Sequence, residues 1–459
     1  MQSLIRRWLV LVEMAGDALI VNAAFLAAFW LRFGGFPEEN FPSFQKVYPY
    51  ITISVIAVYA IYDLYAVDSS WSNRFYSLFT SNLVLLFVGI AVSFVLRGFA
   101  LPRTIFAMAF ALQAVLSTGW RYLTWVWASR AHRPHRLLIV AGEAETRHYL
   151  EALELNGPVE SVVMSPREAD NAATALIGPM NSRAFAVSDA SRALTGDPLA
   201  ELIRQVSPDQ IIIGSDVDAE LRRDLVILAA SQGVTVALAP DSYDLLVLGA
   251  KTMLVGDNLF FEIQAMGGGQ SLLKRVIDLV VAMSGLILLW PVMLLIAPAI
   301  KLDSPGPVFY TQIRVGLAGK EFRLYKFRSM VQHAEKNTGP TLSTKGDPRQ
   351  TRVGRILRAT RLDELPQLVN VIKGEMSIVG PRPERPSFAA RFEHDIPGYR
   401  FRYTVVPGLT GPAQVYGHYS TPAREKLRFD LLYARTRTRI NDLKIILLTL
   451  KTIMKREGS

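Results

Sequence analysis

Four long apolar stretches dominate the first 128 residues and limit the folds open to this chain. They cover about residues 8–31, 47–66, 77–96 and 104–128, each close to the ~20 residues that a helix needs to cross a bilayer. Tryptophans fall towards their ends, where interfacial aromatic residues gather; these are Trp8, Trp30, Trp120, Trp125 and Trp127. We therefore predict four transmembrane helices, because several such helices in succession are rare in soluble proteins.

Charged residues around these stretches predict how they are oriented. Glu13 and Asp17 interrupt the first stretch, so we expect it to remain as a helix rather than to be cleaved as a signal peptide. Basic residues flank the first and fourth stretches, namely Arg6, Arg7, Arg130, Arg133 and Arg136. Because basic residues favour the cytoplasmic side, we expect both ends of this section on the cytoplasmic side of the membrane. Arg97 and Arg103 would then lie in the outer loop, against the rule.

Charge is distributed unevenly along the 459 residues. The net charge is +2 over residues 1–128, −8 over 129–270 and +16 over 271–459, within a total of +10. Such steps indicate separate units, the last of which meets an anionic partner such as phosphate, an anionic membrane surface or nucleic acid. The chain has no cysteine, which excludes disulfides, thiolate nucleophiles and cysteine metal sites.

Residues 131–250 read as an α/β unit. The runs RLLIVA, SVVMS, AFAVS, DQIIIGS and VTVALA are typical of strands, with helices near 144–155, 197–206 and 218–231, and this alternation predicts a parallel sheet of Rossmann type. A dinucleotide site needs Gly-x-Gly-x-x-Gly directly after the first strand. That position reads AGEAETRH, whose acids repel phosphate, so we interpret the sheet as degenerate and structural or regulatory.

A further apolar run follows a short connection. Residues 252–264 predict a hairpin, and MGGGQ at 266–270 a flexible joint. From Val276 to Leu302 the chain is almost continuously apolar, long enough for a fifth crossing, which would place the strongly basic end of the chain outside. Pro291 in its middle predicts a kink. Basic residues at both flanks favour a helix that enters the membrane and turns back over residues 274–302, although a spanning helix stays possible.

Adjacent acids then stand among arginines. Asp363 and Glu364 lie in RATRLDELPQLVNVIKGEMSIVGPRPER, after five arginines and ahead of three more basic residues. Pro366 follows closely, which predicts that the pair sits near a helix start. A positive helix end and nearby guanidinium groups would keep Asp363 ionised. Neighbouring residues on a helix point about 100° apart, so we expect the two carboxylates to have different tasks.

Three ordered motifs carry a family resemblance. They are GPVFYTQIRVGLAGKEFRLYKFRSM at 306–330, TRVGRILRATRLDELPQLVNVIKGEMSIVGPRP at 351–383 and VPGLTGPAQVYG at 406–417. Together they closely resemble the bacterial sugar transferases that are monotopic phosphoglycosyl transferases. The membrane section and Rossmann-like unit ahead of them resemble the long subclass of this family. The resemblance implies transfer of a sugar 1-phosphate from a UDP-sugar to polyprenyl (undecaprenyl) phosphate, with release of UMP, as the first membrane step of exopolysaccharide, capsule or O-antigen synthesis.

The resemblance also implies roles for individual residues. Asp363 would be the nucleophile that forms a covalent phosphosugar intermediate, and Glu364 its partner in Mg²⁺ binding or acid/base assistance. Arg358 and Arg382 match family positions near the phosphates, and guanidinium groups suit that task. Further candidates are Lys326 and Arg328 for phosphate, Gln414 for the nucleotide or sugar pocket, and Pro291 for the break of a re-entrant helix.

The predicted architecture is thus membrane α plus α/β. It comprises a four-helix transmembrane section (1–130), a degenerate Rossmann-like domain (131–250), a hairpin and linker (251–270) and a mostly helical catalytic domain with a re-entrant helix (271–459). The resemblance implies membrane lipids as partners, no nucleic acid, a homodimer by analogy and a catalytic domain on the cytoplasmic face. No pocket motif selects among glucose, galactose and N-acetylated sugars.

Other interpretations of the same residues were weighed. A membrane-anchored nucleotide-sugar dehydratase or epimerase is the alternative, but it needs the glycine fingerprint and a Tyr-x-x-x-Lys pair, and neither is plausibly placed. Asp430 and Asp442 lie in a segment that resembles the end of the family's sequences, and salt bridges explain these two acids equally well. The histidines at 333, 394 and 418 share no metal-binding spacing.

Overall fold

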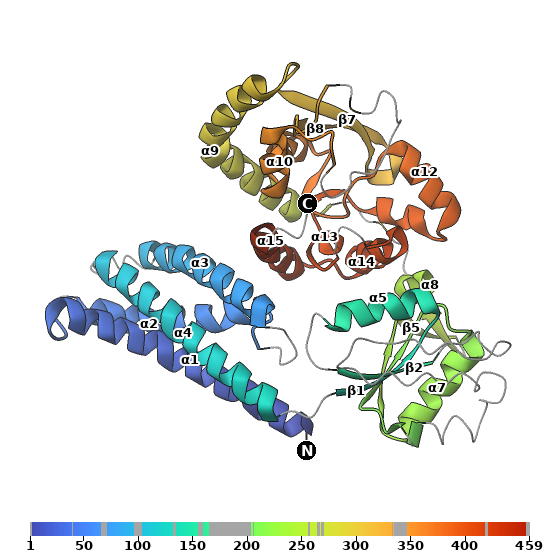
Figure 1. Ribbon diagram of the computed structural model, residues 1–459, viewed down its shortest axis with the longest axis horizontal. Helices are drawn as coiled ribbons and strands as arrows, with labels where there is room; N and C mark the ends of the chain where they lie inside the picture. The colour runs from blue at the N-terminus through green and yellow to red at the C-terminus, as the bar shows by residue number, and fades with distance from the viewer. Residues whose placement is uncertain are drawn as a thin grey trace. The chain divides into compact units, whose positions relative to one another are not determined.

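The computed structural model describes a largely helical protein with a small parallel sheet (Figure 1). The described residues are 2–38, 40–65, 71–95, 103–131, 135–154, 159–164, 203–204, 206–255, 258–263, 267, 270–332, 334, 347–417 and 421–455. The chain divides into two compact units, Met1–Pro240 and Asp241–Ser459.

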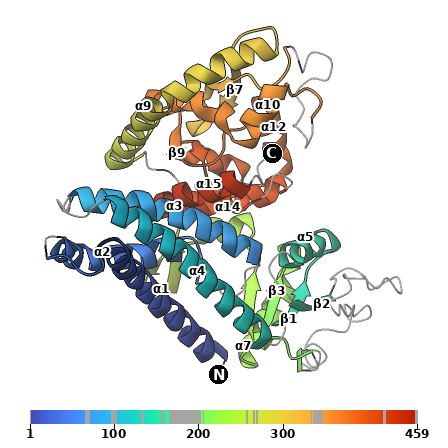
Figure 2. The same ribbon diagram turned by 60° about the vertical axis from the view of Figure 1, so that its left-hand side comes forward.

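Helices occupy all four of the apolar stretches in the first unit. They are α1 (Gln2–Phe33), α2 (Phe41–Ile61), α3 (Trp71–Val95) and α4 (Arg103–Ala131), and α1 packs along both α2 and α4 (Figure 2). The second helix begins six residues before the predicted start, because a proline is tolerated in a first turn, where its missing N–H has no intrahelical partner. Two segments of this bundle, Trp8–Phe33 and Phe41–Ile61, are long and apolar enough to cross a membrane.

The bundle buries charges and exposes apolar side chains. Arg121 of α4 is fully buried and forms ion pairs with Asp17 and, at 2.7 Å, with Glu13 of α1. Leu19 and Val115, in contrast, are each 72% exposed. A soluble bundle has the opposite arrangement, whereas polar residues inside membrane helices face the bundle interior. The bundle is therefore suited to a lipid environment.

The parallel sheet of the first unit has the strand order β2-β1-β3-β4. Its elements are β1 (His135–Val140), α5 (Glu143–Glu154), β2 (Val159–Met164), β3 (Gln210–Ile213), α7 (Ala219–Ser231) and β4 (Thr235–Leu238). Four of the five predicted strands and two of the three helices are confirmed. The strand predicted at AFAVS lies outside the described residues, as does most of the helix predicted at 197–206.

The carboxyl edge of this sheet is closed by the chain's own acids. The backbone N–H of Gly142, just after β1, donates to Asp216 Oδ2 at 2.9 Å, and that of Ser215, just after β3, donates to Glu145 Oε2 at 2.9 Å. In a dinucleotide-binding sheet, backbone N–H groups at this edge approach the pyrophosphate. Here carboxylate oxygens occupy them, in line with the missing glycine fingerprint.

The second unit begins with α8 (Ser242–Val247) and the predicted hairpin, formed by β5 (Lys251–Val255) and β6 (Asn258–Glu262). The remaining elements are α9 (Leu272–Asp303), β7 (Phe309–Val315), η1 (Leu317–Gly319), β8 (Glu321–Phe327), α10 (Arg352–Ala359), η2 (Leu362–Gln367), α11 (Leu368–Lys373), β9 (Ser377–Val379), α12 (Pro386–Asp395), η3 (Tyr399–Thr404), β10 (Gly408–Thr410), α13 (Pro412–Val415), α14 (Ala423–Thr436) and α15 (Arg439–Lys455). Strands β7 and β8 pair antiparallel, and β9 and β10 pair parallel.

Within the described parts of the chain, helix α9 is the third helix long and apolar enough to cross a membrane. It continues through Pro291 and Pro298, and in Figure 1 its ribbon changes direction along its length. Most of its large apolar side chains are exposed; Leu288 and Leu295 are each 74% exposed. This helix therefore presents an apolar surface that the second unit itself leaves uncovered.

Both ends of α9 are tied to the second unit. At its start, Arg275 donates to the carbonyls of Val371 and Ile372 at 2.6 Å, which caps α11. In the next turn the fully buried Asp278 accepts from Ser377 Oγ of β9 at 2.8 Å. At the far end, Asp303 accepts from the backbone N–H of Val353 at the start of α10, at 2.9 Å.

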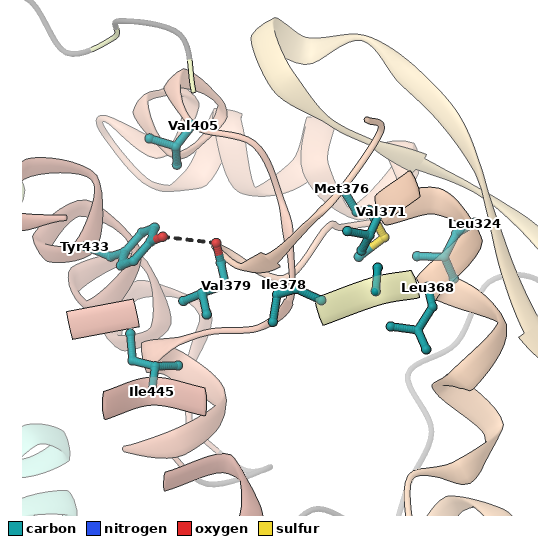
Figure 3. Close-up of a cluster of buried hydrophobic side chains, with 10 residues drawn as sticks. Leu324, Leu368, Val371, Met376, Ile378, Val379, Val405, Tyr433 and Ile445 are labelled. Atoms are coloured by element: carbon teal, nitrogen blue, oxygen red, sulfur yellow. Dashed lines mark hydrogen bonds between the residues drawn. The ribbon is translucent and has the colours of Figure 1, made fainter. Parts of the chain in front are cut away.

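A hydrophobic core organises the elements around β9 (Figure 3). Ile378 and Val379 of this strand are buried between side chains of α11 and α15, including Val371 and Ile445. The Tyr433 hydroxyl of α14 donates to the Val379 carbonyl at 3.0 Å (Figure 3). The strand is thereby fixed on both sides just before the Gly380–Pro383 loop.

Candidate functional site

The acid pair lies at the start of a helical segment, as predicted. Asp363 and Glu364 occupy the first turn of η2, which leads directly into α11. Arg361, the residue before η2, has a left-handed backbone with φ 55° and ψ 16°. Pro366 is accommodated within η2. The pair therefore has a fixed backbone between a left-handed turn and a packed helix.

Glu364 is held by two bases from different elements. Its Oε1 accepts from Lys326 Nζ of β8 at 3.1 Å and from Arg382 Nη2 at 2.6 Å, and its Oε2 accepts from Arg382 Nη1 at 3.4 Å. Burial acts to raise the pKa of Glu364, but Arg382 and Lys326 outweigh it and hold this pKa well below its usual range. Glu364 is therefore an ionised carboxylate that orients both bases.

Asp363 has a different environment. Its side chain is buried, at 7% exposed, yet no hydrogen bond or ion pair engages its carboxylate within the part of the chain that is described. Burial raises the pKa of Asp363 above 3.8, although the charges of Lys326 and Arg358 act to lower it. Burial is the largest of these effects on the pKa of Asp363, and that Asp363 is ionised stays a prediction.

Three of the four predicted phosphate ligands gather around the pair. Lys326 and Arg382 contact Glu364 directly, and Arg358, in the last turn of α10, acts electrostatically on Asp363. Arg328 lies elsewhere: its guanidinium donates to the carbonyls of Ser304 at 2.7 Å and Pro305 at 2.6 Å, at the end of α9. We therefore assign Arg328 to helix capping, because its Nη1 and Nη2 atoms already donate to these carbonyls.

Gln414 lies in α13, where its Nε2 donates to the Leu409 carbonyl at 3.0 Å. No contact described for Gln414 joins it to the acid pair. Asp430 and Asp442, for which salt bridges were one of two explanations, both form ion pairs. Asp430 pairs with Arg402 at 2.8 Å, and Asp442 pairs with Lys274 at 2.9 Å.

Arg402 supports the loop that carries Arg382. The sequence did not single out this residue. Its Nη2 donates to the Arg382 carbonyl at 2.8 Å and also pairs with the buried Asp430 of α14. Burial raises the pKa of Asp430 to about 6, against the opposing effect of Arg402. Arg314 of β7 holds the next part of the loop by donating to the Pro383 carbonyl at 2.9 Å. No local sequence pattern marks such contacts, which join residues far apart in the chain.

The acid pair is the candidate place for a metal ion. Mg²⁺ takes oxygen ligands and binds through one or two carboxylates together with substrate phosphates and water. The unengaged carboxylate of Asp363 fits this requirement, whereas both oxygens of Glu364 already accept from bases. Over the described residues, no group of three or more His, Asp or Glu side chains could hold a metal ion alone. Substrate phosphate would therefore have to complete such a site.

Comparison with known proteins covers mainly the second unit. Residues 269–456 match the family model described as bacterial sugar transferase. An exopolysaccharide production protein PSS of Rhizobium leguminosarum bv. phaseoli is 41% identical over 192 residues, which are 40% of this chain and 96% of that protein. The chain belongs to the bacterial sugar transferase family.

In two other relatives the matched region covers a smaller part of the protein. A UDP-N-acetylgalactosamine-undecaprenyl-phosphate N-acetylgalactosaminephosphotransferase of Aeromonas hydrophila is 43% identical over 190 residues, 41% of this chain and 45% of that protein. A UDP-glucose:undecaprenyl-phosphate glucose-1-phosphate transferase of Xanthomonas campestris pv. campestris is 37% identical over 266 residues, 55% of each chain. The match thus spans about half the length of these relatives.

Replacing Arg402 by lysine tests the support of the Arg382 loop. Lysine keeps the charge opposite Asp430 but loses the planar fork that also reaches the Arg382 carbonyl. We expect Arg402→Lys to destabilise the protein by about 1–3 kcal/mol, the usual cost of leaving a buried polar group unsatisfied. Thermal unfolding in detergent measures this.

The matched control is Arg400→Lys, two residues away in η3, where the side chain is 83% exposed. It should change stability by no more than about 0.5 kcal/mol. Equal unfolding temperatures for the two variants would show that Arg402 does not support the loop.

Proposed function

We propose that this chain transfers a sugar 1-phosphate from a UDP-sugar to undecaprenyl phosphate, releasing UMP and forming a polyprenyl-diphosphate-sugar. The observation that carries the proposal is the contrast within the acid pair. Asp363 offers an unengaged carboxylate, and Glu364 beside it is clamped by Lys326 and Arg382. The substrates named for the related transferases of Aeromonas and Xanthomonas support the same reaction.

In the first step, an oxygen of the Asp363 carboxylate attacks the phosphorus that bears the sugar. The new bond makes an acyl phosphate, the bond between the two phosphates breaks, and the electron pair leaves with UMP. Covalent catalysis of this kind divides one transfer into two steps. The unengaged state of Asp363 supports this role, since no hydrogen bond among the described residues would have to be broken before attack.

In the second step, a phosphate oxygen of the polyprenyl phosphate attacks the same phosphorus. The bond from the Asp363 oxygen to phosphorus breaks, the carboxylate is restored, and the sugar phosphate leaves on the lipid. Lys326, Arg358 and Arg382 neutralise the charge on the phosphate oxygens in both steps, as guanidinium and ammonium groups do in phosphoryl transfer. Glu364 acts as a positioning residue, because its two oxygens hold Lys326 and Arg382.

A bound Mg²⁺ would supply further charge neutralisation on the transferred phosphate. Asp363 is the residue that would hold it, with phosphate and water as the other ligands. Glu364 could join only by exchanging one of its contacts with Lys326 or Arg382.

The membrane arrangement is part of the proposal. We infer four transmembrane helices within residues 1–130, a Rossmann-like domain over 131–250, a hairpin and linker over 251–270 and a catalytic domain over 271–459. The catalytic domain faces the cytoplasm at the inner membrane, and the chain acts as a homodimer in the first membrane step of exopolysaccharide, capsule or O-antigen synthesis. The bundle's exposed apolar and buried charged side chains support the first of these inferences.

We infer that α9 is re-entrant, with Pro291 at its turning point. Its two ends bind one compact unit through Arg275 and Asp278 at the start and Asp303 at the end. A helix that crossed the membrane would have its ends on opposite faces. The attachment of both ends to the same unit supports re-entry.

The covalent step can be tested without a lipid acceptor. Incubation with a UDP-sugar labelled on the β-phosphate should give one UMP per chain and label on the protein, because Asp363 retains the phosphosugar. Asp363→Asn should give neither, since an amide is a poor nucleophile. The control is Asp395→Asn, whose side chain is exposed and which should behave as the unaltered protein. Normal labelling of Asp363→Asn would contradict the covalent proposal.

The absence of cysteine allows topology to be tested with single introduced thiols. Lys251→Cys and Lys320→Cys stand before and after α9, both at exposed positions. Re-entry predicts that an impermeant thiol reagent labels both only from the cytoplasmic side. Labelling of Lys320→Cys from the periplasm would show that α9 crosses the membrane.

A further inference from the structure

Arg361 has a backbone conformation that its residue type does not favour. Its φ of 55° and ψ of 16° lie in the left-handed region, where a side chain crowds the backbone and glycine is the usual residue. Strained residues of this kind persist where the surrounding structure holds them, and they gather at functional sites. Arg361 stands two residues before Asp363, so the strained backbone immediately precedes the helical segment that carries the acid pair.

The guanidinium of Arg361 is committed to no partner in the described structure. It is half-buried and interacts electrostatically with Glu364, Asp363 and Arg382. No hydrogen bond or ion pair of the Arg361 side chain occurs among the described residues. Arg382 and Lys326, in contrast, already donate to Glu364. Arg361 therefore has all its donors available to an incoming ligand.

The charges around the acid pair do not balance without a ligand. Four bases, Lys326, Arg358, Arg361 and Arg382, surround two acids, Asp363 and Glu364, which leaves a net charge of +2. Buried charges are costly unless they are paired. The diphosphate of a nucleotide-sugar carries two negative charges at neutral pH, one on each phosphate. The diphosphate therefore carries charge opposite in sign to this excess.

We propose that Arg361 is a phosphate-binding residue of this chain, which binds the diphosphate of the nucleotide-sugar donor through its unengaged guanidinium. The inference rests on the proposed function, since it assigns a residue to the donor of that reaction. The left-handed backbone directs the chain so that η2 can begin at once with the acid pair. Arg382 and Lys326 already donate hydrogen bonds to Glu364. Arg361 supplies further N–H donors for the diphosphate.

Replacing Arg361 by glycine separates this role from a structural one. Glycine relieves the left-handed strain, so Arg361→Gly should unfold at the same temperature as the unaltered protein or at a higher one. The lost phosphate contact should raise the KM for the UDP-sugar by about 10–100-fold, as expected for charge-assisted hydrogen bonds. The KM for the polyprenyl phosphate should stay within about twofold.

Two substitutions provide matched controls, and a third tests rescue. Ala318→Gly relieves the same kind of strain, at φ 55° in the exposed η1, and should leave both KM values unchanged. Arg355→Ala removes an exposed arginine of α10 and should also leave them unchanged. Arg361→Lys keeps a positive charge and should restore part of the affinity for the donor.

The outcomes separate this inference from the proposed function. An unchanged KM for the UDP-sugar in Arg361→Gly overturns the inference, and so does a lower unfolding temperature with equal loss for both substrates, which would indicate a structural role. If that variant does not fold, Arg361→Asn replaces it, because asparagine tolerates the left-handed region, and the same two results decide. Failure of the unaltered protein to release UMP from any UDP-sugar would instead refute the proposed function.

Discussion

The clamp on Glu364 is the interaction on which the site depends. Two bases from separate elements, Lys326 of β8 and Arg382 of the loop after β9, meet on one carboxylate. Because Glu364 takes these bases, Asp363 is left beside them with no partner of its own among the described residues. Two adjacent acids thereby acquire different properties. The pKa of Glu364 is held low by its bases, while burial raises that of Asp363.

The clamp in turn requires that β9 and its loop are fixed. Asp278 of α9 anchors β9 through Ser377, and Arg402 holds the Arg382 carbonyl from the other side. Thus the apolar helix α9 holds β9, and the buried Arg402–Asp430 ion pair holds the loop that follows this strand. The contact of Asp278 also joins α9 to the rest of the second unit, so the proposed membrane helix and the proposed chemical centre share this support.

The acid pair and its position at a helix start were predicted from the sequence, because neighbouring residues carry both. Lys326 and Arg382 were singled out as phosphate ligands through the family resemblance, and their contacts with Glu364 were not predicted. The sequence did not distinguish Arg328 from a phosphate ligand, since its capping role depends on where α9 ends in space. Nor could it find Arg402. A chain with 50 basic and 40 acidic residues offers too many possible pairs for one to be chosen without the fold. Nor does the sequence show that burial raises the pKa of Asp363, because burial is a property of packing.

The most direct test of the divided pair compares Glu364→Gln with Asp363→Asn in the first half-reaction, without lipid acceptor. If Glu364 only positions bases, Glu364→Gln should still release one UMP per chain and carry the label, at a rate about 10–100-fold lower. Asp363→Asn should do neither. Complete loss of labelling in a folded Glu364→Gln protein, equal to that of Asp363→Asn, would contradict the account and place Glu364 in the chemical step itself.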